Sequence, residues 1–207
     1  MTKYLEKLND TKYNDLTKNL KKFAEEHNVP IMEEDGILAI KMLIKLTNAK
    51  KILEIGTAIG YSAILMASEP SVERLDTIER NEEMYKYALQ NIKEADLTEK
   101  IKVHFGDALE INFECLAEEY DLILIDAAKA QYQKFFDLYT PLLKSKGIVI
   151  TDNILFHGCV ENQENLSKNV LHMVQKIDLY NNELKENPNY ETFFLPLGDG
   201  QAISIKR

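Results

Sequence analysis

Short apolar runs alternate with amphipathic stretches along most of the chain. Five runs rich in isoleucine, leucine and valine are predicted as β-strands, at residues 51–55, 75–79, 101–105, 121–126 and 147–151. Between them, apolar residues recur at the helical period, which predicts helices at 62–67, 81–95 and 132–143. Strands that alternate with helices are typical of a parallel, doubly wound α/β sheet, and this is the fold class that we expect.

The first quarter of the chain follows the helical period instead. Apolar positions recur at helical spacing over residues 13–27 and again over 36–46, and Val29-Pro30 interrupts the pattern. We therefore predict a helical N-terminal extension over residues 1–48. No linker, repeat or low-complexity stretch divides the remainder, so residues 1–207 are expected to form a single domain.

The C-terminal part predicts a different strand pairing. A long helix, at about residues 164–186, precedes two strands at 190–195 and 201–205. The turn between these strands, residues 197–200, is too short for a helical crossover, so the pair should form an antiparallel hairpin. Five parallel strands and this hairpin make a seven-stranded sheet with helices on both faces.

Composition narrows the class of protein. Hydrophobic residues make up 45% of the chain and charged residues 29%, as in soluble globular proteins. The chain shows no secretory signal and no apolar run near the roughly 20 residues of a membrane helix, so a cytoplasmic location without membrane attachment is expected. Cys115 and Cys159 make neither a disulfide framework nor a zinc cluster, and both are interpreted as reduced packing residues.

The distribution of charge limits the kinds of partner. A net charge of −9 argues against a protein that coats nucleic acid through bulk electrostatics. Residues 1–51 nevertheless hold ten lysines against eight acidic residues. A local basic patch is one interpretation and solvated helix faces are the favoured one. The lysines concerned are Lys12, Lys18, Lys21, Lys22, Lys41 and Lys45.

Residues beyond the carboxyl ends of the strands are the candidate ligand site, as in other open α/β sheets. Gly56 and Gly60 follow the first strand, where one glycine permits a sharp turn and the second a close backbone approach to a ligand. Their spacing differs from the G-x-G-x-x-G fingerprint, which argues against NAD. Glu79 ends the second strand, where a carboxylate can accept hydrogen bonds from both hydroxyls of an adenosine ribose. The short acid of Asp107-Ala108, after the third strand, can meet the adenine amino group.

Each of these acids alone is equally well explained as a helix cap or a loop residue. Three successive strand ends with suitable chemistry favour a nucleoside ligand. Glu54, inside the first strand, is interpreted as orienting the amino group of a sulfonium cofactor indirectly.

The fourth and fifth strands end in carboxylates as well. Asp126 closes one, and Asp152-Asn153 closes the other. Because both ends lie at the same edge of the sheet, the three side chains should converge as oxygen ligands, which suit Mg²⁺, Mn²⁺ or Ca²⁺ rather than zinc. Helix capping is the alternative for either acid alone, but two uncompensated carboxylates in one crevice need a cation.

Lys129 lies one short turn beyond Asp126 and is the candidate general base. A hydroxyl beside a second oxygen can chelate a cation through both atoms, which stabilises the oxyanion. The positive field of the cation also favours the neutral form of the lysine. Asp126 and Lys129 are therefore the predicted catalytic residues of an O-methyl transfer. His157 is an alternative base, although a surface histidine without a catalytic role is the favoured interpretation.

These segments resemble the cation-dependent O-methyltransferases of the catechol and caffeoyl-CoA type. The matching residues are 54–62 (EIGTAIGYS), 125–129 (IDAAK) and 151–153 (TDN). The resemblance implies the Rossmann-like fold of class I methyltransferases, S-adenosyl-L-methionine as the methyl donor, and a divalent cation, most commonly Mg²⁺, held by Asp126, Asp152 and Asn153. Lys129 is the implied base. The predicted cofactor contacts are Met32 or Ile31, Glu54, Gly56, Ser62, Glu79, Asp107, Ala108 and Asp126.

Within that family, further segments are similar to the bacterial enzymes that methylate 5-hydroxyuridine at the tRNA wobble position. They are residues 30–32, 125–132, 135–136, 151–156 and 197–204. The similarity implies 5-methoxyuridine as the product, the tRNA anticodon loop as the substrate and a homodimer as the assembly. O5 and the neighbouring O4 of 5-hydroxyuridine form a chelating pair, as the two oxygens of a catechol do.

Three other functions stay open at this stage. The same machinery can methylate a small catechol-like or acyl-CoA-linked phenol. A nucleotide-binding oxidoreductase of the NAD type is more distant, because the missing fingerprint and the oxygen ligands count against it. A catalytically silent binding module is the last alternative, and the presence of Lys129 beside the oxygen ligands argues against it.

Overall fold

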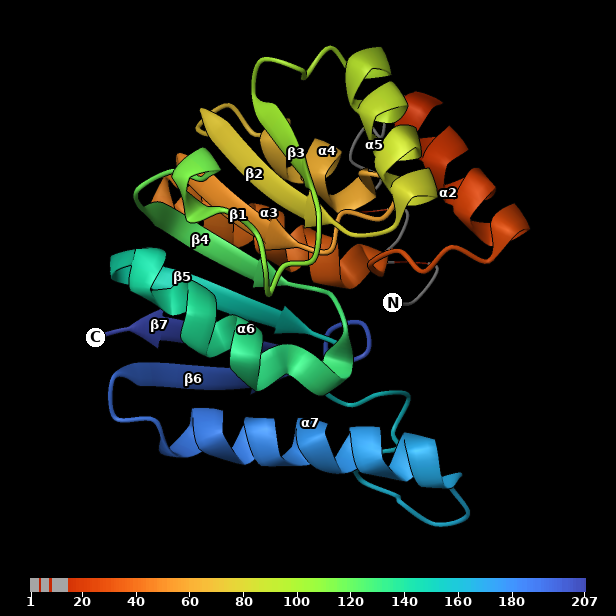
Figure 1. Ribbon diagram of the computed structural model, residues 1–207, viewed down its shortest axis with the longest axis vertical. Helices are drawn as coiled ribbons and strands as arrows, with labels where there is room; N and C mark the ends of the chain where they lie inside the picture. The colour runs from red at the N-terminus through yellow and green to blue at the C-terminus, as the bar shows by residue number, and fades with distance from the viewer. Residues whose placement is uncertain (1–3, 5–7, 9–14) are drawn as a thin grey trace.

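A seven-stranded sheet forms the centre of the protein (Figure 1). The computed structural model describes Tyr4, Leu8 and residues 15–207. The strands are β1 (Lys51–Ile55), β2 (Arg74–Glu79), β3 (Ile101–Phe105), β4 (Tyr120–Ile125), β5 (Leu143–Asp152), β6 (Tyr190–Leu195) and β7 (Gln201–Lys206). Their order in the sheet is β3-β2-β1-β4-β5-β7-β6. The first five strands pair in parallel, and β7 runs antiparallel to both β5 and β6, which confirms the predicted sheet and its closing hairpin.

Helices cover both faces of this sheet and create two apolar layers. On one face lie α2 (Asp15–His27), α3 (Glu34–Thr47), α4 (Tyr61–Ala67) and α5 (Glu82–Glu94), and on the other lie α6 (Tyr132–Tyr139) and α7 (Lys168–Glu186). Figure 1 shows α6 in front of the sheet and α3 and α4 behind it. In β4, Leu122 and Leu124 join the first layer while Ile123 and Ile125 join the second. This two-sided burial explains why the strand is apolar at successive positions.

Two predicted boundaries need correction. The helix predicted over residues 132–143 ends at Tyr139, and a 3₁₀ turn, Thr140–Leu142, replaces its last part. Pro141 explains the change, since proline lacks the N–H group that an α-helix interior requires. Strand β5 consequently begins at Leu143 rather than at residue 147. Helix α7 begins at Lys168, four residues later than predicted, because the Ser167 side chain caps it by accepting the Val170 N–H at 3.4 Å.

The N-terminal helices bring a connecting segment over the carboxyl edge of the sheet. Helix α2 ends at His27, and Asn28 takes a left-handed conformation that turns the chain into residues 29–33. Met32, in that segment, is only 4% exposed and packs in the first apolar layer. The start of the helix predicted at residues 13–27, like most of the extension before residue 15, lies outside the described residues.

Acidic partners neutralise most of the lysines that suggested a basic patch. Lys41 and Lys45 both pair with the buried Glu69, at 3.2 and 2.6 Å. Lys21 pairs with Glu34, and Lys22 pairs with Glu26 one helical turn away. Lys18 is exposed, and Lys12 lies outside the described residues. The favoured interpretation, solvated helix faces, therefore fits the structure better than a groove of free positive charge.

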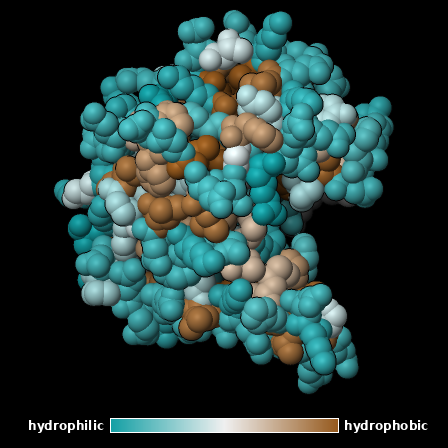
Figure 2. Space-filling view, viewed as in Figure 1, coloured by the Kyte–Doolittle hydropathy of each residue, from teal (hydrophilic) through white to brown (hydrophobic). Residues whose placement is uncertain are grey.

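The face shown in Figure 2 is mostly hydrophilic, with hydrophobic residues visible in its middle. Within the part of the chain that the structure describes, no helix has both the length and the apolar character needed to cross a membrane.

Both cysteines are free, but Cys115 is exposed, so its interpretation as a packing residue is wrong.

Candidate active site

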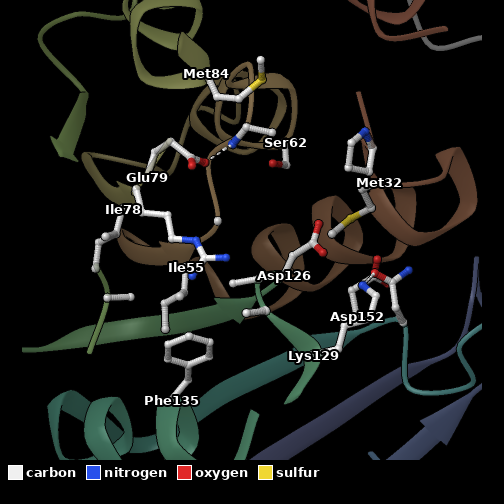
Figure 3. Close-up of a pocket in the computed structure, with 18 of the residues that line it drawn as sticks. Met32, Ile55, Ser62, Ile78, Glu79, Met84, Asp126, Lys129, Phe135 and Asp152 are labelled. Carbon is white, nitrogen blue, oxygen red and sulfur yellow. Dashed lines mark hydrogen bonds between the residues drawn. The ribbon is translucent and has the colours of Figure 1, made fainter. Parts of the chain in front are cut away.

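A cavity of about 640 Å³ opens at the carboxyl ends of the parallel strands. The loops after β1, β2, β3, β4 and β5 form its walls, and residues 29–33 cover it from the N-terminal side. In Figure 3, Glu79, Met84 and Ser62 lie on one side, Lys129 and Asp152 on the other, and Asp126 between them. The predicted residues that line the cavity are Ile31, Met32, Gly56, Ser62, Glu79, Asp107, Ala108, Asp126, Lys129, Asp152 and Asn153.

Glu79 and Asp107 mark one end of the cavity, which we call the Glu79 end. Main-chain N–H groups hold both side chains in place. Glu79 accepts the Ala58 N–H at 2.8 Å and the Asn81 N–H at 2.7 Å, one on each carboxylate oxygen. Asp107 accepts the Leu109 N–H at 2.9 Å. Neither side chain caps a helix, since Asn81 is the N-cap of α5 and the next helical turn after Asp107 begins only at Phe113. Both acids are loop residues, and this is compatible with the ligand interpretation, because an ionised carboxylate has lone pairs left for further donors.

Gly56 and Gly60 have different structural roles in the loop after β1. Gly56 has a φ of +102°, and a Cβ there would come within 2.0 Å of the Asp126 carbonyl oxygen. Only glycine can therefore bring this turn against the end of β4. Gly60 has a φ of +84° and faces Ala88 of α5, with the position of a Cβ 3.5 Å from the Ala88 Cα. Gly60 is the N-cap of α4 and is not among the residues that line the cavity, so the structure gives no support to the expected approach of its backbone to a ligand.

Glu54 lies behind Ser62 rather than in the cavity. Its side chain is fully buried, accepts a hydrogen bond from the Ser62 hydroxyl and accepts another from Thr77 Oγ1 at 2.6 Å. Burial raises the pKa of Glu54 to about 8, although these two hydrogen bonds oppose the shift. Ser62 lines the cavity. The hydrogen bond from the Ser62 hydroxyl therefore connects Glu54 to the cavity.

Asp126, Asp152, Asn153 and Lys129 form the opposite end, which we call the Asp126 end. Strands β4 and β5 are neighbours, and Ile125 pairs with Thr151, so Asp126 and Asp152 follow at the same level of the sheet. Asn153 turns the chain with a left-handed φ of 58°, a conformation that asparagine tolerates better than most residues. The Lys129 ammonium donates a hydrogen bond to Asn153 Oδ1. The topology thus brings together all four side chains that we predicted to act together.

The two carboxylates at this end lie in an unfavourable environment. Burial and the neighbouring Asp126 charge raise the pKa of Asp152 to about 7, and Asp152 is only 3% exposed. Burial also raises the pKa of Asp126, although the charge of Lys129 opposes the shift. A bound cation would relieve both effects.

The donor atoms at the Asp126 end fit a hard divalent cation. Two carboxylates and one amide oxygen are the ligand types that Mg²⁺ or Mn²⁺ prefers. Among the residues that the structure describes, no cluster of three or more His, Cys, Asp or Glu side chains is arranged for a metal. The fit therefore depends on the Asn153 amide as the third protein ligand.

His157 lies at the rim of the cavity. Its side chain is 77% exposed, and its main-chain N–H donates to Asp199 Oδ1 at 2.6 Å. This exposure agrees with the favoured interpretation of a surface histidine.

Sequence reasoning missed several residues that belong to the site. Arg80, Met84 and Phe135 line the cavity, and Gln201 contacts Asp152 from behind it. Arg80 directly follows a strand, so the strand-end argument that selected Glu79 could have included it. Met84 and Phe135 resemble ordinary helix positions, and the contact of Gln201 depends on the sheet order, so no local signal was present.

The comparisons with known proteins agree with this geometry. The sequence profile of a family described as O-methyltransferase matches residues 8–207. The chain belongs to the O-methyltransferase family. It is 32% identical over 196 residues to caffeoyl-CoA O-methyltransferase 1 of Arabidopsis thaliana, covering 90% of this chain and 76% of the plant protein. It is also 30% identical to flavonoid 3′,5′-methyltransferase of Vitis vinifera, over 85% of this chain and 77% of that protein. This membership sets the oxidoreductase alternative aside.

Solved structures of this family share the fold. One from Staphylococcus aureus, provisionally assigned as a caffeoyl-CoA O-methyltransferase, is 47% identical with a TM-score of 0.92, over 99% of this chain and 98% of that one. The O-methyltransferase from Bacillus cereus, solved in complex with S-adenosylhomocysteine, is 24% identical with a TM-score of 0.84, over 99% of this chain and 96% of that one. These similarities confirm the class I methyltransferase fold predicted from the sequence.

Proposed function

We propose that this O-methyltransferase moves the methyl group of S-adenosyl-L-methionine to a hydroxyl oxygen that has a second oxygen beside it, with a divalent cation at the Asp126 end. One observation carries the proposal: Asp126, Asp152, Asn153 and Lys129 line the same cavity as Glu79 and Asp107. The cavity therefore combines groups suited to a nucleoside with groups suited to a cation. When bound, the cation supplies Lewis-acid stabilisation of the developing oxyanion.

The Glu79 end is proposed to hold the methyl donor. The Glu79 carboxylate, fixed by two main-chain N–H groups, has acceptor positions left for the two ribose hydroxyls. Asp107 accepts from the adenine amino group. Ser62 and Met32 also line the cavity, and in our proposal they contact the methionine part of the donor. The sulfur would then face the Asp126 end.

At the Asp126 end, Lys129 is proposed to remove the proton of the acceptor hydroxyl. Its amine contacts Asn153 Oδ1, so it lies beside the proposed cation ligands. A cation held by Asp126, Asp152 and Asn153 would also orient the acceptor. Two adjacent acceptor oxygens fixed at one site define the plane of the acceptor and the direction of attack. The acceptor oxygen replaces the lost O–H bond with the new O–CH₃ bond, and sulfur keeps the electron pair of the bond that breaks.

A lysine substitution tests this role separately from cation binding. Lys129→Met should lower kcat by about 100-fold or more, the usual contribution of a general base. The affinity for Mn²⁺, measured by electron paramagnetic resonance, should remain close to that of the wild type. If kcat stays unchanged with the cation bound, the lysine is not the base and the cation alone activates the acceptor.

We further propose that the acceptor is 5-hydroxyuridine at the tRNA wobble position, giving 5-methoxyuridine. The similarity over residues 125–132, 151–156 and 197–204 supports this acceptor, and O4 and O5 offer the required adjacent oxygens. A single unstacked base in a loop can reach a cavity without extensive duplex contact. This agrees with a chain whose N-terminal lysines Lys21, Lys22, Lys41 and Lys45 already have acidic partners.

A small phenol with adjacent oxygens is the second candidate acceptor. The caffeoyl-CoA and flavonoid O-methyltransferases to which the chain is 30–32% identical favour it. The chemistry at the Asp126 end is the same for both acceptors, so the distinction depends on what docks outside the cavity.

One experiment separates the two acceptors. Purified protein with Mg²⁺ and labelled S-adenosyl-L-methionine is offered tRNA from a strain that lacks the gene, and in parallel catechol and caffeoyl-CoA. We expect label in tRNA, and 5-methoxyuridine in its nucleoside digest by mass spectrometry. Label in the phenols alone would overturn the tRNA proposal and support the second candidate. The same preparation, examined by analytical ultracentrifugation, tests the proposed homodimer.

A further inference from the structure

A buried glutamine contacts the Asp126 end from behind. Gln201, the first residue of β7, is 0% exposed, and its Nε2 donates to Asp152 Oδ1 at 3.1 Å. The same nitrogen lies 3.9 Å from the Met32 sulfur, a weak acceptor on the N-terminal side of the cavity. The two N–H groups of the amide therefore have two acceptors. The ionised carboxylate that a cation requires can only accept, so the nitrogen rather than the oxygen of the amide faces Asp152 in that form.

The surroundings of Gln201 indicate that its side-chain amide does not serve to stabilise the folded protein. Its Oε1 atom is buried without a hydrogen-bond partner in the part of the protein that the structure describes. An unpaired buried oxygen lowers stability, whereas an apolar side chain of similar length would not carry that penalty. Helix α3 also leaves room for the amide, because a Cβ on Gly36 would come within 2.8 Å of Gln201 Nε2.

We propose that Gln201 is a positioning residue for the cation ligand Asp152. By engaging Oδ1, the amide restricts rotation of the Asp152 carboxylate about its Cβ–Cγ bond and presents the group to the cavity in one orientation. Its contact with Met32 joins the same hydrogen-bonded group to the segment that covers the cavity. Outer partners of metal ligands commonly act in this way, by fixing the orientation of the ligand before the ion binds. The inference rests on the proposed cation site.

Two substitutions act on the same amide from different sides. Gln201→Met keeps the length of the side chain and removes both donors. Gly36→Ala keeps Gln201, but the added methyl group displaces the amide, and alanine is no worse than glycine inside a helix. Ser204→Ala is the matched control, because Ser204 is a buried residue of β7 whose hydroxyl bonds Thr192 Oγ1 at 2.9 Å, away from the cavity.

The measured quantity is the affinity for Mn²⁺, followed by the electron paramagnetic resonance signal of the free ion. Gln201→Met should weaken binding by about 10- to 100-fold, the usual effect of losing an outer partner. Gly36→Ala should weaken it in the same direction by a smaller factor. Ser204→Ala should stay within about twofold of the wild type, since it contacts neither the ligands nor the amide.

Melting temperature and affinity for S-adenosylhomocysteine are recorded for every variant. A weaker Mn²⁺ affinity with both of these preserved supports a positioning role. If Gln201→Met and Gly36→Ala bind Mn²⁺ as tightly as the wild type, the inference is overturned while the proposed function stands. If Mn²⁺ affinity falls only together with S-adenosylhomocysteine affinity and melting temperature, the residue is merely structural and the inference is again overturned. A wild-type protein that binds no Mn²⁺ would remove the proposed function itself.

Discussion

The two ends of the cavity hold their carboxylates in opposite ways. At the Glu79 end, the main-chain N–H groups of Ala58, Asn81 and Leu109 already donate to Glu79 and Asp107. At the Asp126 end, Asp126 and Asp152 lie close to each other inside the protein, and burial raises the pKa of both. The first end is complete in the protein alone, whereas the second needs a positive charge that the chain supplies only in part, through Lys129.

This difference predicts that the two ends can be separated experimentally. A group held by the backbone is preorganised, so a substitution there should affect only the ligand that it binds. A group in an uncompensated pair depends on the cation, so a substitution there should affect cation binding and turnover together. The following changes test that separation, beginning with the largest expected effect.

Asp126→Asn should lower kcat/KM by at least about 1000-fold, or roughly 4 kcal/mol of transition-state stabilisation. The reason is the loss of a charged cation ligand at the Asp126 end. Binding of S-adenosylhomocysteine, measured by calorimetry, should change far less. Asp121→Asn is the matched control at the opposite end of β4, where Asp121 accepts the Lys51 N–H at 2.8 Å. Full activity of Asp126→Asn, or full activity of the wild type in EDTA, would contradict the assignment.

Glu79→Gln tests the other end. It replaces a charged acceptor by a neutral one, so affinity for S-adenosylhomocysteine should fall by about 10- to 100-fold, as expected for hydrogen bonds to an ionised group. Mn²⁺ affinity should be unchanged, which is the mirror image of the Asp126 result. Asp107→Asn should have a smaller effect, because Asp107 is exposed. Loss of Mn²⁺ binding in Glu79→Gln would show that the ends are not independent.

The pH dependence of stability in the metal-free protein gives a further test of the difference between the two ends of the cavity. The ordinary pKa of Asp152 is 3.8, and in the folded protein it is about 7. Between these values the unfolded carboxyl is ionised while the folded one keeps its proton, so stability falls as the pH rises through this window. A cation needs the ionised form, so Mn²⁺ affinity should rise over the same window by up to about tenfold per pH unit.

Melting temperatures at pH 5 and pH 8, with and without Mg²⁺, check this expectation. Mg²⁺ should raise the melting temperature much more at pH 8 than at pH 5. Asp152→Asn should flatten the slope partly, leaving the contributions of Asp126 and of Glu54, whose pKa values are also raised, that of Glu54 to about 8. An equal effect of Mg²⁺ at both pH values would show that Asp152 does not gate cation binding.

The smallest effect is expected at His157. Its side chain is 77% exposed at the rim of the cavity, so His157→Ala should leave kcat within about twofold of the wild type. The pH profile of kcat should also keep its shape. A loss as large as that expected for Lys129→Met would make His157 the base.

Much of the fold and of the candidate site could be predicted because the signals are local. The strands at residues 51–55 and 101–105 were predicted with the bounds that the structure shows, since each is a short run rich in apolar residues. Asp126 and Asp152 could be paired in advance, because parallel strands bring their carboxyl ends to the same edge. The hairpin followed from the shortness of its turn.

Other features arise from contacts that no local pattern contains. Gln201 meets Asp152 across 49 residues of chain and Met32 across 169, and Gly60 faces Ala88 of α5. Glu69, just after the end of α4, neutralises Lys41 and Lys45 of α3. Periodicity and strand-end chemistry identify which residues reach the edge of the sheet. Which side chains become partners there depends on the packing of distant segments, because hydrogen bonds and ion pairs form only between atoms that the whole fold brings within reach.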